Sequence, residues 1–156
     1  PVFGDNGFGD GAKKTLEYVL DELIPNVKNR YGLKNDIPVV LGGYSLAGLF
    51  SLWSMYETDL FYAVCGVSPS VWFEGWDEYP ASHLPGSQKV YLSLGKKEEK
   101  TKNPVMSLVG DRIRKLEEIL RNSDVKCILE WNEGGHFNDP GERCAKGFIW
   151  CLNNED

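Results

Sequence analysis

The sequence lacks several patterns that mark other classes of protein. No apolar run approaches the ~20 residues that a membrane-spanning helix requires, and no basic stretch followed by an apolar one forms a leader. Basic residues number 17 against 23 acidic ones, and the resulting net charge of −6 disfavours nucleic acid or an anionic membrane as the main partner. We therefore expect neither a nucleic-acid partner nor a membrane partner.

Cysteine occurs only four times, and never in a Cys-x-x-Cys pair. Without such a pair the sequence suggests neither a structural zinc site nor a redox-active dithiol. The preferred interpretation is that Cys65, Cys127, Cys144 and Cys151 are free thiols in a reducing compartment. This predicts a cytoplasmic protein.

The apolar residues alternate between two periodicities along the chain. They predict helices over residues 12–31, 46–55, 104–122 and 142–152, and strands over residues 37–41, 63–67, 90–94 and 125–131. Pro25 should kink or split the first helix, and the glycine-rich residues 1–11 should form a loop. Strands that alternate with helices predict an α/β fold, here a three-layer sandwich with a predominantly parallel sheet of about four strands. At 156 residues the chain is expected to form a single domain, residues 1–156.

A serine stands where the first predicted strand turns into the second predicted helix. Gly43 and Ala47 lie two residues to either side of Ser45, as in a nucleophile elbow, where the strained turn leaves no room for bulky neighbours. The usual motif ends in glycine, and the methyl of Ala47 is the smallest departure from it. The backbone N–H of Leu46 would then lie at a helix N-terminus, where it could donate to a developing oxyanion.

A serine nucleophile needs a base, and the sequence contains only two histidines. His136 directly follows the last predicted strand in a Gly-Gly-His turn, whereas His83 lies in a predicted surface loop. Active sites of parallel sheets form beyond the carboxyl ends of the strands, so His136 is the candidate base.

The acid that orients the base should follow the third strand, in the chain order serine, acid, histidine. Two adjacent carboxylates, Glu98 and Glu99, stand there within a charged loop. Glu98 is preferred on the spacing from Gly95, but Glu99 stays open. Asp139 is a weaker candidate.

Four aromatic residues follow the second predicted strand: Trp72, Phe73, Trp76 and Tyr79. They could line a substrate pocket, or they could form a lid that packs on itself. Trp72, together with Tyr44 beside the serine, is the candidate substrate contact.

These motifs together resemble the putative esterase family of α/β-hydrolases, which includes esterase D, feruloyl esterases and enterochelin esterases. The resemblance covers most of residues 12–152, and four segments carry it in family order: Gly43-Tyr44-Ser45-Leu46-Ala47-Gly48-Leu49-Phe50, Ser68-Pro69-Ser70-Val71-Trp72, residues 93–104, and Glu133-Gly134-Gly135-His136-Phe137. It implies a nucleophile at Ser45, a base at His136 and an acid at Glu98 or close by.

The sequence also departs from the family. Its members carry several further strands before the first helix seen here, and a loop among them supplies a second oxyanion N–H. Residues 1–11 are too short to replace those strands. We therefore expect a sheet truncated on its N-terminal side, the C-terminal portion of the family's domain, whose bare edge could pair with a second copy.

The sequence thus predicts a serine carboxylic-ester hydrolase that acts on a small-molecule ester through a Ser-His-acid triad and an acyl-enzyme. This chemistry requires no metal and no cofactor. Two alternatives stay open. The same triad could serve an acyltransferase or a peptidase, or the chain could be an incomplete hydrolase domain, inactive alone, that acts as a binding or assembly module.

Overall fold

The computed structural model describes residues 11–153, so most of the glycine-rich loop expected at residues 1–11 lies outside it. Contacts divide the chain into two compact units, Pro1–Pro38 and Val39–Asp156. The assignment of residues 1–156 to a single domain stays a prediction.

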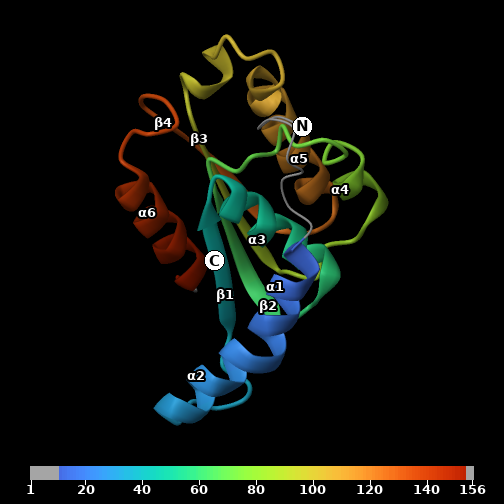
Figure 1. The fold of residues 1–156 in the computed structure, drawn as a ribbon, viewed down its shortest axis with the longest axis vertical. Coiled ribbons are helices and arrows are strands. Elements are labelled where there is room, and N and C mark those ends of the chain that lie inside the picture. Colours follow the sequence, from blue (N-terminus) through green and yellow to red (C-terminus); the bar gives the residue numbers. More distant parts are fainter. Residues whose placement is uncertain (1–10, 154–156) are drawn as a thin grey trace. The chain divides into compact units, whose positions relative to one another are not determined.

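The first unit is helical and is interrupted beside its proline. Helix α1 (Ala12–Tyr18) continues into a π-helical segment, η1 (Val19–Leu23), and then into α2 (Ile24–Tyr31), as Figure 1 shows in blue. Pro25 stands in the first turn of α2, where its missing N–H breaks the regular hydrogen-bond pattern of the preceding helix. The predicted helix over residues 12–31 is confirmed; it is not divided in two at Pro25, but its α-helical pattern is interrupted by the π-helical segment that precedes the proline.

The second unit is built on a four-stranded parallel sheet. Its strands lie side by side in chain order: β1 (Val39–Tyr44), β2 (Phe61–Val67), β3 (Lys89–Gly95) and β4 (Lys126–Asn132). All four predicted strands are present, and all neighbours pair in parallel. The first strand runs further than predicted, because Gly42 and Gly43 stay paired with β2 and only Ser45 makes the turn.

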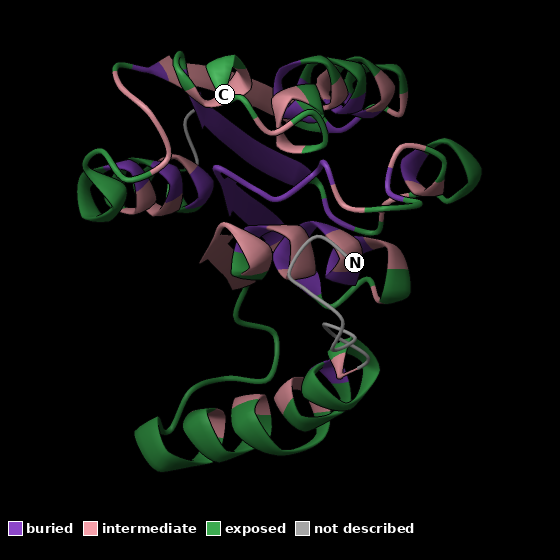
Figure 2. Cartoon of the chain, turned by 45° about the horizontal axis from the view of Figure 1, so that its top comes forward, coloured by how far each residue is buried: buried purple, intermediate pink, exposed green. Residues whose placement is uncertain are grey.

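Helices cover both faces of this sheet. Helix α3 (Leu46–Glu57) packs on β1 and β2, and α5 (Val109–Asn122) packs on β3 and β4. Helix α6 (Pro140–Leu152) contacts β1, β2 and β3 from the other face, so the central strands β2 and β3 are buried between two layers of helix (Figures 1 and 2). The predicted three-layer α/β sandwich is confirmed.

Three short helices complete this unit: α4 (Tyr79–Ser82) and two 3-10 turns, η2 (Glu98–Lys100) and η3 (Met106–Leu108). The helix predicted from residue 104 therefore begins as a 3-10 turn and becomes α-helical only at Val109. The side chain of Asn103 accepts hydrogen bonds from the N–H groups of Val105 and Met106, which caps this turn.

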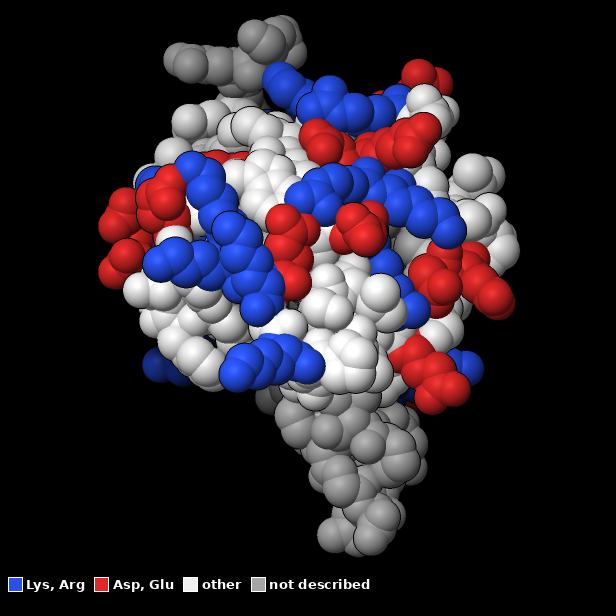
Figure 3. Space-filling view, turned by 90° about the horizontal axis from the view of Figure 1, so that it is seen from above, with Lys and Arg blue, Asp and Glu red and all other residues white. Residues whose placement is uncertain are grey.

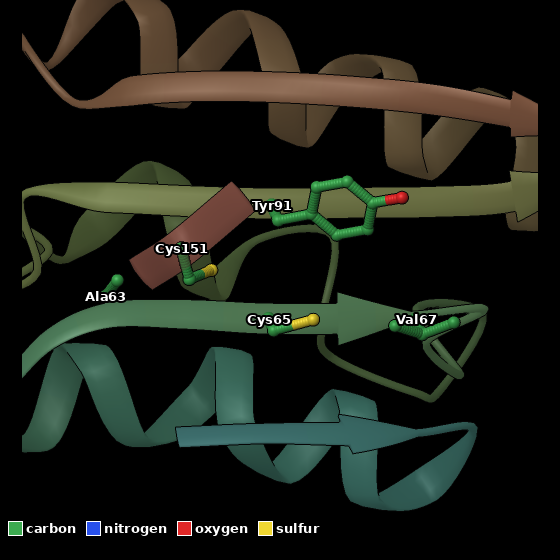
Figure 4. Close-up of a cluster of buried hydrophobic side chains, with 5 residues drawn as sticks. All are labelled: Ala63, Cys65, Val67, Tyr91 and Cys151. Carbon is green, nitrogen blue, oxygen red and sulfur yellow. The ribbon is translucent and has the colours of Figure 1, made fainter. Parts of the chain in front are cut away.

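The core beneath α6 is tightly packed. Figure 4 shows five of its buried residues: Ala63, Cys65, Val67, Tyr91 and Cys151. Helix α6 approaches this cluster through Gly147, where an added Cβ would lie only 2.3 Å from the Cys65 Sγ. All four cysteines lie in the described region and are free thiols, as predicted. None of the helices in the described region has the length and hydropathy needed to cross a bilayer.

Candidate active site

Ser45 occupies a strained turn between β1 and α3. Its φ of 59° and ψ of −120° lie outside the regions that residues with a side chain normally adopt. Three backbone hydrogen bonds hold it there. The Ser45 N–H donates to the Val67 carbonyl at 3.0 Å, and the Ser45 carbonyl accepts from Leu49 at 3.0 Å and from Ser70 at 3.1 Å. The fold therefore fixes this serine at the carboxyl edge of the sheet.

Small neighbours make the turn sterically feasible. A Cβ added to Gly43 would lie 2.4 Å from the carbonyl carbon of Ala47, and one added to Gly48 would lie 3.0 Å from the Gly43 oxygen. The methyl of Ala47 fits because Gly43 carries none. The turn thus has room for Ala47 at the position where the usual motif has glycine.

Residues that follow all four strands meet at this edge. Ser45 follows β1, Ser68 follows β2, Glu98 follows β3, and His136 follows β4. Figure 3 looks onto this end of the molecule, where Lys and Arg side chains alternate with Asp and Glu around uncharged surface.

His136 lies between the serine and a carboxylate. Its Nε2 is 3.1 Å from the Ser45 Oγ, and its Nδ1 is 2.7 Å from the Glu98 Oε2. The tight turn that carries it contains Gly134 at φ 87°, whose carbonyl accepts from the Lys97 N–H at 2.9 Å. This bond ties the histidine loop to the loop that carries Glu98.

The structure distinguishes the two adjacent carboxylates. Glu98 turns inward, and its side chain is only 5% exposed. Glu99 instead pairs with Arg114 on α5, at 2.8 Å. Glu98, and not Glu99, is therefore the carboxylate brought to His136.

Hydrogen bonds keep the buried Glu98 ionised. Burial by itself would raise the pKa of this carboxyl, but hydrogen bonds from His136, from Ser68 and from the Gly95 N–H together lower it below its usual value. The Ser68 hydroxyl and the Gly95 N–H donate to Oε1 at 2.5 and 2.7 Å. The other carboxylate oxygen is left for His136.

The remaining acid and base candidates lie away from this line of contacts. Asp139 is the N-cap residue of α6. His83 stacks on Tyr79 with ring centroids 4.0 Å apart, and its Nδ1 lies 2.9 Å from the Tyr79 carbonyl. Among the described residues, Asp139 forms no hydrogen bond with His136, and His83 forms none with Ser45.

The other predicted site residues lie around this constellation. Leu46 is the first residue of α3, where helical N–H groups have no partner within the helix. The Tyr44 ring lies 5.1 Å from the His136 ring, and burial raises the pKa of its phenol. Trp72 is buried to 8% exposure, and Trp76 stacks on Tyr79, so the aromatic segment packs largely on itself. Substrate contacts by Tyr44 and Trp72 stay predictions.

Two further residues at the site were given no role from the sequence. Ser68, at φ 42°, donates to Glu98 and accepts a hydrogen bond from Arg143 on α6. Arg143 also lies 3.3 Å from the Glu98 Oε1. The sequence signal that could have identified Arg143 is its spacing. It stands four residues before Gly147, which stands four residues before Cys151, so all three lie on the same buried face of α6.

The site contains no arrangement that suggests a metal. Within residues 11–153, no group of three or more His, Cys, Asp and Glu side chains is placed to hold a metal ion.

Comparison with known proteins gives a consistent assignment. A sequence model of the family described as "Putative esterase" matches residues 5–138. No protein with a curated description matches the chain.

Solved structures with the same fold include three hydrolases. The enterobactin esterase FES from Shigella flexneri is 20% identical with a TM-score of 0.72, covering 87% of this chain and 37% of that protein. An IroE-like serine hydrolase from Shewanella oneidensis is 18% identical with a TM-score of 0.72, covering 92% of this chain and 50% of that protein. The siderophore hydrolase EstB from Aspergillus nidulans is 19% identical with a TM-score of 0.72, covering 97% and 63%. At these identities the likeness is one of fold, and this chain spans only part of each protein's length.

Proposed function

The chain belongs to the Putative esterase family, and from that premise we propose that it hydrolyses carboxylic esters with Ser45 as the nucleophile. In this proposal His136 is the general base, and Glu98 is the acid that orients it. Leu46 contributes a backbone N–H to the oxyanion site.

One observation supports this proposal above the others. Ser45 Oγ, His136 and Glu98 form a continuous line of contacts, at 3.1 and 2.7 Å, although they come from three loops far apart in the sequence. A serine hydroxyl is a weak nucleophile at neutral pH, and this arrangement is the one that activates it.

The reaction would proceed in two halves. Ser45 Oγ attacks the ester carbonyl while its proton moves to His136 Nε2, and the carbonyl oxygen becomes an oxyanion. The C–O bond to the alcohol then breaks, and the alcohol leaves with the proton from His136. Water attacks the resulting acyl-enzyme with the same base, and the acid is released as Ser45 recovers its proton.

Electrostatics favours the charges that develop. The ionised Glu98 stabilises His136 when it becomes positively charged, and it accepts a hydrogen bond from Nδ1 so that Nε2 faces Ser45. The Leu46 N–H lies in the first turn of α3, where the helix dipole also favours negative charge. One such donor is typically worth about 10²–10³ in rate.

The substrate is a further part of the proposal. Three proteins of similar fold are described as an enterobactin esterase, an IroE-like serine hydrolase and a siderophore hydrolase, so siderophore esters belong in a first substrate panel beside simple aryl esters. Acyl transfer or peptide cleavage would use the same residues. Inclusion of amide substrates and alcohol acceptors distinguishes these reactions from ester hydrolysis. We also propose that the reaction takes place in the cytoplasm and needs no cofactor.

The test is covalent labelling of the folded chain with a fluorophosphonate, followed by intact mass and peptide mapping. The chain's two histidines provide a matched pair of variants. We expect one label on Ser45, its absence in Ser45→Ala, its near-complete loss in His136→Ala, and its retention in His83→Ala.

Labelling elsewhere, or equal loss in both histidine variants, would refute the assignment of Ser45 and His136. A folded chain that takes no label at any pH would favour a role as a binding or assembly module instead.

A further inference from the structure

Helix α6 buries an arginine beneath the proposed site. The Arg143 side chain is 2% exposed and is one of the largest fully buried side chains in the described chain. A buried cation is costly unless an anion and hydrogen bonds compensate for its lost hydration. The partners of Arg143 therefore indicate why it is there.

Those partners lie on the side of Glu98 that faces away from His136. The Arg143 Nη2 donates to the Ser68 Oγ and lies 3.3 Å from the Glu98 Oε1. The guanidinium carbon also lies 5.8 Å from the centre of the Tyr44 ring. Among residues 11–153, neither Nε nor Nη1 of Arg143 has a hydrogen-bond partner. The side-chain hydrogen bonds that Arg143 does make are thus confined to Glu98 and its neighbour Ser68.

We propose that Arg143 is the resident counter-ion of Glu98, and that its charge keeps His136 unprotonated and able to act as a base near neutral pH. This role rests on the proposed function. Arg143 is a positioning residue in it, because it acts on the reaction only through Glu98.

The charges around Glu98 support this role. His136 faces it from the loop after β4, and Arg143 faces it from α6. The phenol of Tyr44 on β1 and the hydroxyl of Ser68 are neutral. On the loop that carries Glu98, Lys96 pairs with Glu133 at the surface and Lys97 is exposed, while Arg114 of α5 pairs with Glu99.

Without Arg143, a proton on His136 would be the nearest positive charge to the buried carboxylate. In a poorly solvated site an anion strongly favours a cation beside it, so His136 would hold its proton to higher pH. Arginine cannot release its own proton in a protein. Its permanent charge therefore takes the place that the proton on His136 would otherwise fill.

Proton NMR of His136 tests this directly and does not depend on activity. In a His83→Ala background His136 is the only histidine, so its ring signal can be followed unambiguously from pH 4 to pH 9. We expect Arg143→Met to move the titration midpoint of that signal upward by about one pH unit. Arg143→Lys, which keeps the positive charge, should have a titration midpoint close to that of the parent.

Lys146→Met is the matched control. It removes a positive charge from the same helix, but Lys146 is half-exposed and pairs with Glu130 and Glu142 rather than with Glu98. Water and salt screen such a charge, so the midpoint should stay within about 0.2 pH units of the parent. If Arg143→Met does not fold, Arg143→Gln removes the same charge and keeps a donor for Ser68.

A midpoint in folded Arg143→Met or Arg143→Gln that coincides with the parent would overturn the proposal. In labelling experiments, the acid limb of the fluorophosphonate rate should move to higher pH by the same amount as the NMR midpoint. A chain that takes no label but shows the expected NMR shift would reject the proposed function and keep the counter-ion role. A chain that labels normally but shows no NMR shift would reject the counter-ion role and keep the proposed function.

Discussion

Replacement of Glu98 by glutamine should stop His136 from acting as the proposed base, while a side chain of nearly the same shape still fills position 98. Two hydrogen-bond donors, the Gly95 N–H and the Ser68 hydroxyl, point at Oε1, and Arg143 lies on the same side. The amide oxygen of the new side chain is favoured at this position, because an NH₂ group there would face the Gly95 N–H and the Arg143 guanidinium, which can only donate. The NH₂ group is then turned toward Nδ1 of His136.

That orientation reverses the hydrogen bond to the histidine. For His136 to accept the Ser45 proton at Nε2, its Nδ1 must carry the hydrogen and donate to an acceptor. An NH₂ group at this point is a donor, so the imidazole adopts the other tautomer and Nε2 carries the hydrogen. The equivalent amide substitution in a Ser-His-Asp triad lowers kcat by about 10⁴, which corresponds to about 5.5 kcal/mol in the activation barrier. We expect a loss of this order in Glu98→Gln.

The assay is the second-order rate of fluorophosphonate labelling, together with kcat/KM on an aryl ester. Glu99→Gln is the matched control, since it makes the same chemical change one residue away. It removes a partly exposed ion pair with Arg114, worth about 0–1 kcal/mol of stability, and should leave both rates within about twofold. A Glu98→Gln rate within tenfold of the parent, or an equal loss in Glu99→Gln, would refute the reasoning.

Three further predictions follow from the geometry of the site. Ser45→Gly should abolish labelling yet raise stability in chemical denaturation by about 1 kcal/mol, because glycine tolerates the φ of 59°; a less stable variant would contradict the strain argument. Gly43→Ala should lower the free energy of unfolding by about 1–3 kcal/mol, since the new Cβ would lie 2.4 Å from the Ala47 carbonyl carbon. Gly141→Ala is the control and should not lower it, because nothing lies within 4 Å of the added Cβ. Equal melting temperatures for the two variants would show that the turn relaxes freely. The folded state lowers the pKa of Glu98 below its ordinary value of 4.5, so the ionised carboxylate stabilises the fold above that pH, and this contribution is lost as the pH falls through the folded-state pKa. The difference in unfolding free energy between the parent and Glu98→Gln should therefore shrink in acid. A constant difference from pH 7 to pH 3 would argue against this.

Much of the fold could be predicted from the sequence because its signals are local. Alternating apolar patterns identified four strands and the helices between them, and Pro25 marked the break in the first helix. Boundaries were less predictable. Gly42 and Gly43 suggested a turn but remain in β1, because pairing with β2 continues to Tyr44. The helix predicted from residue 104 begins with a 3-10 turn that Asn103 caps, and α5 begins only at Val109.

Part of the candidate site could also be predicted from the sequence. Ser45 and His136 could be named from the sequence, since each stands in a glycine-rich turn directly after a predicted strand. Parallel strands bring such turns to one edge of a sheet, whatever their separation in the chain. The sequence alone determined which turns could meet.

The tertiary structure decided which side chains meet there. Glu98 and Glu99 are chemically equivalent neighbours, and only the conformation of η2 turns one inward and pairs the other with Arg114. Arg143 comes from a helix and Ser68 from a strand end, yet both contact the same oxygen of that carboxylate, and no local pattern records their contact. The placement of a charge in a protein interior depends on the partners that neutralise it, and these partners are assembled only when the chain folds.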